Sequence, residues 1–279
     1  MRETPAPDPL LHNAFREGLR QRALDPENRW IGGYVAYEWD HARHLFDCSG
    51  VEFAGRRVLE FGCNIGATAI VLAHLGANVT AIDVMLDEID LAQLNAAQYA
   101  LKQPVSFLHV ADSTAIPFSG ECFDVVVCNS VLEYVAPTQL KAVQTELNRV
   151  LKPGGALFVM GTSSRLAARE VHSRRWLVNY LPSVLDSFLE LNGSVQRGIW
   201  PCAVRHGFGS HYDDLDHLDR AQAYFQARQL MGASRLKLGL LRVAARLAAT
   251  VGWSVGMLTP NISLRLRKTG SSAIPASMS

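Results

Sequence analysis

The sequence lacks an excess of charge of either sign. Its 279 residues include 27 basic and 26 acidic side chains, which gives a formal net charge of +1. Proteins that gather nucleic acid through their overall electrostatic field carry a clear basic surplus. We therefore expect a small-molecule partner and no nucleic acid.

Cysteine is scarce and follows no metal-binding or disulfide pattern. The five cysteines are odd in number and include no CxxC pair, which argues against a disulfide framework and a zinc site. The first residues lack the basic and then apolar layout of a signal peptide. The most apolar stretch, Leu236 to Leu258, is interrupted by Lys237, Arg242 and Arg246, so we expect no integral membrane segment. These absences predict a cytoplasmic protein.

Hydrophobic residues make up 48% of the chain, and from Arg57 short apolar runs alternate with amphipathic ones. This alternation predicts βαβ units and a Rossmann-like, doubly wound α/β sheet that is mostly parallel. Ligands of such sheets bind at the carboxyl ends of the strands. The predicted strands are Val58–Phe61, Val79–Ile82, Val105–His109, Phe123–Cys128 and Ala156–Met160. The predicted helices between them are Ala67–Leu75, Leu86–Leu101 and Thr138–Leu151.

The flanking segments suggest five parts. We predict a tail and helical lid at 1–54, a core at 55–161, a helical insertion at 162–236, a completion of the core at 237–268 and a flexible tail at 269–279. Two helices, Leu10–Leu24 and Tyr34–Phe46, form the predicted lid. The alternation stops for about 75 residues after Gly161, which is too long for an ordinary connection. We interpret the insertion as a cap over the site.

The C-terminal part predicts a helix at Leu238–Val251, a strand around Ser254–Leu258 and an antiparallel last strand at Ile262–Arg267. The arginines at two-residue spacing in the last strand suggest one solvated face, as on an edge strand. The helix has a basic and an apolar face. Such a helix could rest on a membrane, but packing on the sheet is the favoured interpretation.

A strand followed by a glycine-containing turn is the strongest local signal. Val58-Leu59-Glu60-Phe61-Gly62-Cys63-Asn64-Ile65-Gly66 leads into a helix whose first N–H groups are free. Asp83 follows Gly62 by 21 residues, at the end of the next strand. A carboxylate there can accept hydrogen bonds from both ribose hydroxyls. The two features together predict a nucleoside cofactor.

The turn departs from the dinucleotide fingerprint. A GxGxxG motif would need glycine at Asn64 and Ala67, so two of the three glycines are missing. Glu60, two residues before Gly62, suits an ammonium group instead. Further motifs follow in order: Ala111-Asp112-Ser113, the run from Phe123 to Val135, and Leu151-Lys152-Pro153-Gly154-Gly155.

With these motifs the sequence resembles the class I methyltransferases that use S-adenosylmethionine (SAM), in particular the small-molecule group. The resemblance covers about Gly55 to Gly161 and, more faintly, Gly252 to Lys268. It implies SAM as the cofactor and transfer of a methyl group to an oxygen or nitrogen of a small molecule, such as a sugar or a specialised metabolite.

The resemblance also implies roles for individual residues. Glu60, Gly62 and Gly66 would line the methionine side, Asp83 would hold the ribose, Asp112 would contact the adenine amino group and Asn129 would lie beneath the sulfonium. Asn64, Val84 and Ser113 belong to the same set, and Tyr37 in the lid is expected to reach the cofactor. The family has glycine where this chain has Asn64, but Asn tolerates left-handed backbone, so the turn should survive.

A general base is needed only for an acceptor that carries a proton, such as a hydroxyl. The predicted cap offers two candidates, His172 and His206, since histidine titrates near neutrality. The cap is also rich in aromatic residues, which suggests an acceptor with an apolar or ring surface. These aromatic residues are Trp176, Tyr180, Phe188, Trp200, Phe208 and Tyr212.

Several other readings stay open. His211, Asp213, Asp214, Asp216 and His217 resemble metal ligands, but aspartates that cap a helix at Leu215–Leu230 explain them better, so we predict no metal. We expect Cys202, after Pro201, to be structural, and His41 and His44 to pack or face solvent. The alternatives to a soluble small-molecule methyltransferase are an NAD(P)-dependent oxidoreductase, a related protein that only binds SAM, and a methyltransferase with a lipid-linked acceptor at a membrane surface.

Overall fold

The computed structural model describes residues 3–182, 185 and 197–270. Within this part, seven strands form one sheet in the order β3-β2-β1-β4-β5-β7-β6. The first five strands pair in parallel, and β7 runs antiparallel to both of its neighbours. The mostly parallel sheet with an antiparallel last strand is therefore confirmed. The strands are β1 (Arg57–Phe61), β2 (Asn78–Asp83), β3 (Ser106–His109), β4 (Phe123–Asn129), β5 (Leu151–Ser163), β6 (Tyr212–Asp214) and β7 (Asn261–Lys268).

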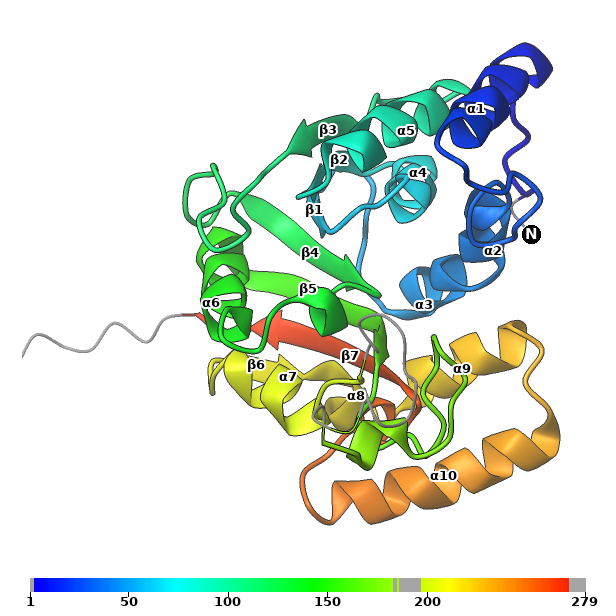
Figure 1. The fold of residues 1–279 in the computed structure, drawn as a ribbon. Helices are drawn as coiled ribbons and strands as arrows, with labels where there is room; N and C mark the ends of the chain where they lie inside the picture. The colour runs from blue at the N-terminus through cyan, green and yellow to red at the C-terminus, as the bar shows by residue number, and fades with distance from the viewer. Residues whose placement is uncertain (1–2, 183–184, 186–196, 271–279) are drawn as a thin grey trace, which may run out of the picture.

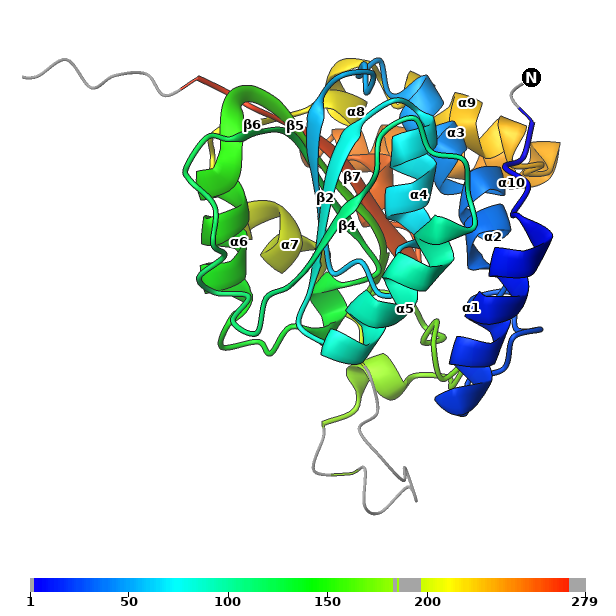
Figure 2. The ribbon, with the colours of Figure 1, turned by 90° about the horizontal axis from the view of Figure 1, so that it is seen from above.

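Helices cover both faces of the sheet (Figure 1). The helices α6 (Leu140–Val150) and α7 (Pro201–Gly207) lie on one face, and α4 (Ala67–His74) and α5 (Leu86–Ala97) lie on the other, as the view from above shows (Figure 2). Alternate side chains of β1 enter the two cores. Leu59 belongs to the core beneath α6, whereas Val58 belongs to the core beneath α4. Because side chains alternate along a strand, Glu60 points to the same side as Val58.

The N-terminal segment packs against the α4 side. Helix α1 (Pro9–Gln21) begins at Asp8, whose carboxylate accepts from the N–H groups of Leu10 and Leu11, and packs on α5. The helix predicted at Tyr34–Phe46 is divided into α2 (Tyr34–Asp40) and α3 (Ala42–Cys48). The break occurs because His41 has φ −122° and ψ −74°, outside the helical range. Helix α2 packs on α4 and thereby reaches the carboxyl ends of the strands.

The predicted insertion belongs partly to the sheet. After the 3-10 helix η2 (Val178–Tyr180), the chain forms α7 and then β6, which pairs with β7. The expectation that the alternation stops throughout 162–236 was therefore wrong; β6 has three residues and gives almost no periodicity.

The helix predicted at Leu215–Leu230 is also divided. It forms α8 (Leu215–Leu218) and α9 (Gln222–Leu230), because Arg220 and Ala221 between them have positive φ. The prediction that aspartate caps the start of this helix is confirmed, since the Asp214 carboxylate accepts from the N–H groups of Asp216 and His217. In the described part of the chain, no group of His, Cys, Asp or Glu is arranged to hold a metal ion.

Two predictions for the C-terminal part were wrong. The strand expected around Ser254–Leu258 is a 3-10 helix, η4 (Val255–Met257), which follows α10 (Arg235–Ala249). The last strand is not at an edge, because β7 lies between β5 and β6. Arg265 is buried, where it pairs with Asp216 at 3.0 Å and also with Asp219, whereas Arg267 is exposed.

Candidate functional site

The turn after β1 is shaped by three left-handed residues. Gly62, Asn64 and Gly66 have φ of +73°, +47° and +76°. A Cβ atom on Gly62 would lie 2.1 Å from Cγ2 of Val131, so a larger residue here would force Val131 to shift. The left-handed conformation expected of Asn64 is confirmed. The turn therefore forms without the glycine that the family has at this position.

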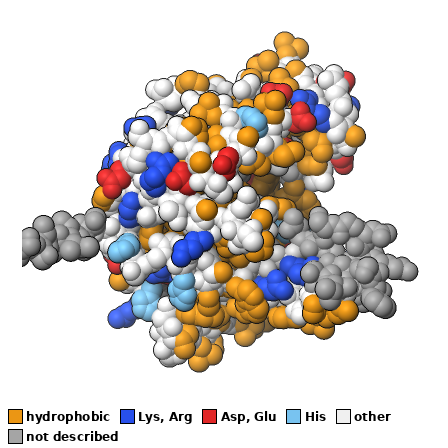
Figure 3. Space-filling view, turned by 60° about the vertical axis from the view of Figure 1, so that its left-hand side comes forward, with side chains coloured by type: hydrophobic (Ala, Val, Ile, Leu, Met, Phe, Trp, Pro, Cys, Tyr) orange, Lys and Arg blue, Asp and Glu red, His pale blue; other side chains and the backbone are white. Residues whose placement is uncertain are grey.

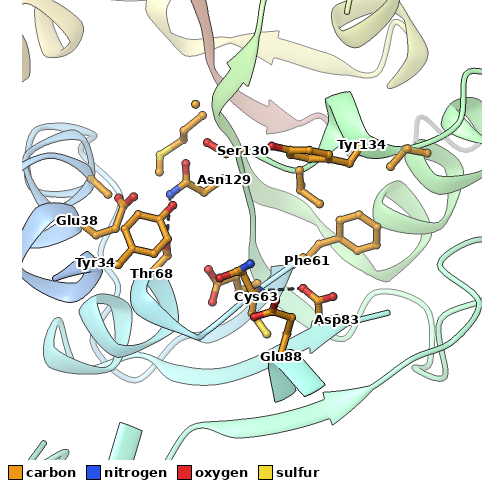
Figure 4. Close-up of a pocket in the computed structure, with 18 of the residues that line it drawn as sticks. Tyr34, Glu38, Phe61, Cys63, Thr68, Asp83, Glu88, Asn129, Ser130 and Tyr134 are labelled. Carbon is orange, nitrogen blue, oxygen red and sulfur yellow. Dashed lines mark hydrogen bonds between the residues drawn. The ribbon is translucent and has the colours of Figure 1, made fainter. Parts of the chain in front are cut away.

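Asp83 at the end of β2 is held beside this turn. Its Oδ2 accepts from the Asn64 N–H at 2.8 Å, and its Oδ1 accepts from the Met85 N–H at 3.0 Å. The two backbone donors fix the orientation of the carboxylate at the edge of the cavity (Figure 4). Each carboxylate oxygen can accept a second hydrogen bond, which leaves capacity for a pair of ligand hydroxyls.

Two buried carboxyl groups, those of Glu60 and Glu38, lie close to each other near this turn. Glu60 is only 2% exposed, and its Oε2 has no hydrogen-bond partner among the described residues. Burial, and then the charge of Glu38, raises the pKa of Glu60 well above its usual range. Burial also raises the pKa of Glu38 to about 7, against the opposing effect of hydrogen bonds from Tyr34 and Asn129. Two neighbouring buried carboxyl groups, one of them with an unpartnered oxygen, suit a cationic group such as a ligand ammonium.

These groups line one cavity of about 1260 Å³ at the carboxyl ends of the strands. Asn129 at the end of β4 donates through Nδ2 to Thr68 Oγ1 at 3.0 Å, which links β4 to the first turn of α4. Figure 4 shows Glu38, Tyr34 and Asn129 on one side of the cavity and Asp83 and Glu88 on another. The lining includes residues from the N-terminal helices, the core and the segment after β5.

His172 lies in the wall contributed by the segment after β5. Its Nε2 is 3.3 Å from Oε1 of the buried Glu133, and its Nδ1 is 3.5 Å from the hydroxyl oxygen of Tyr134. The hydrogen bond to Glu133 raises the pKa of His172 above its usual value, although burial opposes this effect. Glu170 fixes the backbone here by accepting from the His172 N–H at 2.9 Å. The arrangement orients one ring nitrogen toward a carboxylate, as in a base held by a charged partner.

The structure brings most of the predicted residues together. Those lining the cavity are Tyr37, Glu60, Gly62, Asn64, Asp83, Val84, Asp112, Ser113, Asn129 and His172. Asp112 also caps a turn, because its Oδ1 accepts from the N–H and hydroxyl of Thr114, and these bonds lower its pKa.

Two predicted residues lie elsewhere. Gly66 is not among the cavity-lining residues; a Cβ atom there would meet the ring of Phe107 at 2.8 Å, so its small size serves the packing of α4. His206 is exposed on α7, on the opposite face of the sheet from α4. A sequence pattern could not separate His172 from His206, because both are histidines of the predicted cap with arginine close by in the sequence.

The aromatic residues expected around the acceptor are placed differently. Phe208 and Tyr212 are buried in the core beneath α6, whereas Trp176, Tyr180 and Trp200 are exposed. Phe188 lies outside the described residues. The aromatic side chains that do line the cavity are Trp30, Tyr34, Tyr37, Phe61 and Tyr134. An aromatic wall exists, but it comes mainly from the N-terminal segment.

Of the residues that α2 and its end contribute to the cavity, sequence reasoning found only Tyr37. Tyr34, Glu38 and His41 all line the cavity, and His41, which we expected to pack or face solvent, also stacks on Tyr37 with ring centroids 4.1 Å apart. Spacings of three and four residues from Tyr34 to His41 place these side chains on one helix face. That periodicity was a usable signal for a polar face turned toward a ligand.

Comparison with known proteins identifies the family. Residues 59–159 match a family described as a methyltransferase domain. The chain is 30% identical over 221 residues to ubiquinone biosynthesis O-methyltransferase of Xylella fastidiosa (strain M23), which covers 74% of this chain and 85% of the relative. It is 33% identical over 161 residues to the mitochondrial ubiquinone biosynthesis O-methyltransferase of Mus musculus, which covers 52% of this chain and 42% of the relative.

Two solved structures share the fold. Phosphoethanolamine N-methyltransferase 1 of Haemonchus contortus, in complex with phosphoethanolamine and S-adenosylhomocysteine, matches with a TM-score of 0.53 and 11% identity over 95% of this chain and 50% of that chain. The cyclase SpnF matches with a TM-score of 0.51 and 19% identity over 96% and 99% of the two chains. At these identities the likeness shows the fold alone. The sequence relatives, together with the sheet order and the cavity, show that this chain belongs to the class I SAM-dependent methyltransferases and that SAM is its cofactor.

Proposed function

We propose that this enzyme methylates a hydroxyl oxygen of a small molecule that has a ring or an apolar surface. The observation that carries the proposal is the His172–Glu133 pair, because His172 lines the same cavity as the polar groups suited to the cofactor. An oxygen acceptor must lose a proton on methylation, and a carboxylate-oriented histidine is suited to receive it. The O-methyltransferase names of the sequence relatives support the same choice.

The chain offers a binding group for each part of SAM. We assign the ammonium to Glu60 and Glu38, the ribose hydroxyls to Asp83 and the adenine side to Asp112 and Ser113. Asn129 is assigned to the region of the sulfonium. Val84, which lines the cavity directly after Asp83, gives the adenine side an apolar contact.

The bound cofactor supplies the methyl group as an electrophile on a positively charged sulfur. The residues of the chain position the acceptor hydroxyl and take its proton. If the Nε2–H of His172 donates to Glu133, its Nδ1 keeps a lone pair and accepts the proton as the C–O bond forms. Glu133 then stabilises the resulting imidazolium. The buried ring of Phe61 and the half-buried rings of Tyr34 and Tyr37 limit the access of water to the cavity.

Residues 162–236 are assigned to the acceptor side of the cavity. Val171, His172, Arg174, Arg228 and Met231 all come from this range and all line the cavity. The Tyr34, Tyr37 and Tyr134 rings offer apolar contact for a ring-bearing acceptor. A lipid-linked acceptor remains an alternative, which the exposed face of α10 favours.

The test is the identity of the methylated product. We expect purified protein to bind S-adenosylhomocysteine in a calorimetric titration and to transfer methyl groups from SAM to phenols or alcohols in a panel that also contains matched amines. Mass spectrometry would locate the new methyl group. Products methylated on nitrogen alone would contradict the proposal while leaving the family assignment intact.

A further inference from the structure

Helix α10 presents an apolar face to the outside of the molecule. Leu236, Leu240, Val243 and Leu247 are 76%, 64%, 56% and 66% exposed. Their spacings of four, three and four residues place them on one side of the helix, and the exposed Val251 continues the line. We call these five residues the α10 stripe. A surface helix normally turns such a face inward, so this exposure calls for a partner.

The opposite face of α10 already holds the helix in place. Leu238 and Ala248 are buried, and Leu241 and Ala245 pack against a cluster formed by Ala221, Tyr224 and Val255. The helix therefore packs mainly on α9 and η4. We had expected it to pack on the sheet, so that prediction was wrong. In Figure 1 it lies along the lower boundary of the molecule, beyond α8 and α9.

The charged residues of the segment that carries the stripe all have one sign. From Gln222 to Leu264 the chain contains no acidic residue but five basic ones, namely Arg228, Arg235, Lys237, Arg242 and Arg246. Arg235, Arg242 and Arg246 follow spacings of seven and four residues, which align them along one flank of the stripe. On the face that Figure 3 shows, acidic and basic side chains are mixed, and hydrophobic side chains gather toward its lower edge.

We propose that α10 docks on an anionic lipid bilayer. The α10 stripe enters the boundary between headgroups and acyl chains, and the flanking arginines bind lipid phosphates. An exposed apolar face beside a basic flank is the pattern of helices that lie in the plane of a membrane surface. A second copy of the chain is a poorer occupant, because joining two stripes would bring two rows of arginine together without an acidic residue on either helix.

The docking would place the site near the membrane. Arg228 and Met231, at the end of α9, line the cavity, and α10 begins at Arg235. Because three residues separate Met231 from α10, docking holds this wall of the cavity close to the lipid surface. The inference concerns the location of the enzyme and holds whichever atom of the acceptor is methylated.

The test is co-sedimentation of the full chain with vesicles. One set contains phosphatidylcholine only, and the other contains about one-third phosphatidylglycerol, which gives the negative surface that basic segments recognise. We expect binding to the second set, weakened by salt. The variants L240S/L247S and R235Q/R246Q should each bind at least about tenfold more weakly. L10S/L218S, which changes two exposed leucines on α1 and α8, is the matched control and should bind as the wild type does.

Each variant must also bind S-adenosylhomocysteine with unchanged affinity, which shows that the cavity is intact. Equal binding to both vesicle sets, no binding to either, or unaltered binding by L240S/L247S would overturn the proposal. Light scattering after gel filtration tests the alternative that a second copy of the chain covers the α10 stripe. A dimer that L240S/L247S dissociates, without vesicle binding by the wild type, would show that the stripe joins two copies instead.

Discussion

The ionisable residues of the cavity have different partners for their charge. Asp83 accepts two backbone hydrogen bonds at the cavity edge, whereas Glu60 lies buried with an unpartnered oxygen among the described residues. His172 keeps contact with both a carboxylate and the cavity. The chemistry of the site therefore depends on individual environments that residue type alone does not specify.

Glu38 should make stability depend on pH. Burial raises its pKa from 4.5 to about 7, so the folded protein holds a proton that the unfolded chain loses earlier. Its contribution to the free energy of unfolding is then complete below about pH 4.5 and is lost as the pH rises through about 7. We expect Glu38→Gln to raise stability relative to the wild type more at pH 8 than at pH 5 in urea unfolding. Glu52→Gln, at an exposed position, is the control; an equal effect of Glu38→Gln at both pH values would refute this origin.

His172 should act on turnover and not on cofactor binding. We expect His172→Gln to lower kcat about a hundredfold, within the range for loss of a general base, and to leave the dissociation constant of S-adenosylhomocysteine unchanged. Wild-type kcat should rise with pH above 6.5, since the pKa of His172 is raised and only its neutral form accepts a proton. The control is His206→Gln on α7, which should keep full activity. If both variants were equally active, His172 would not be the base.

At the scale of elements, the turn between β1 and α4 is the most constrained connection. Gly62 and Gly55 have nearly equal φ, +73° and +71°, but only Gly62 has a neighbour that a Cβ would strike. The comparison separates backbone strain from steric clash.

Alanine at these two glycines should have different costs. Gly55→Ala should lower the free energy of unfolding by about 1 kcal/mol through strain in the left-handed region. Gly62→Ala should cost a further amount of about 1–3 kcal/mol from overpacking against Val131. Adding Val131→Ala to Gly62→Ala should restore part of this loss. Urea unfolding of the wild type, the two glycine variants and the double variant gives the four free energies. Equal losses at both glycines would mean that Val131 moves aside without cost.

At the scale of the whole molecule, distant segments are joined through β7. Arg265 pairs with Asp216 in α8 and with Asp219, which directly follows this helix. Its guanidinium also donates to the carbonyl of Ser49, the residue that follows α3. The N-terminal helices, α8 and the sheet thus meet at one buried cation. Helix α3 also packs on α9. Both helices contribute residues to the cavity wall, so this ion pair lies beside two parts of that wall.

Removing that cation should destabilise the protein strongly. Arg265→Ala should lower the free energy of unfolding by about 3–5 kcal/mol, because it leaves a buried carboxylate without its partner. Arg267→Ala, two residues along the same strand but exposed, should change it by less than about 0.5 kcal/mol. Denaturant unfolding of the two variants gives the comparison. Similar small effects would show that water or rearrangement replaces the ion pair.

The sequence by itself determined the local features. The order of the strands from β1 to β5 and of the helices between them, the turn at Gly62 and the carboxylate at Asp83 all follow from periodicity and short spacings, which act within a few residues. The tertiary structure decided what depends on distant partners. Arg265 and Arg267 look alike in the sequence, yet only Arg265 is buried, against Asp216, Asp219 and the Ser49 carbonyl. Likewise, only the packing of α2 and of the segment after β5 brings Glu38 and His172 to the same cavity. The pairing of Arg265 with Asp216 and of His172 with Glu133 depends on neighbours far along the chain, which a local pattern does not specify.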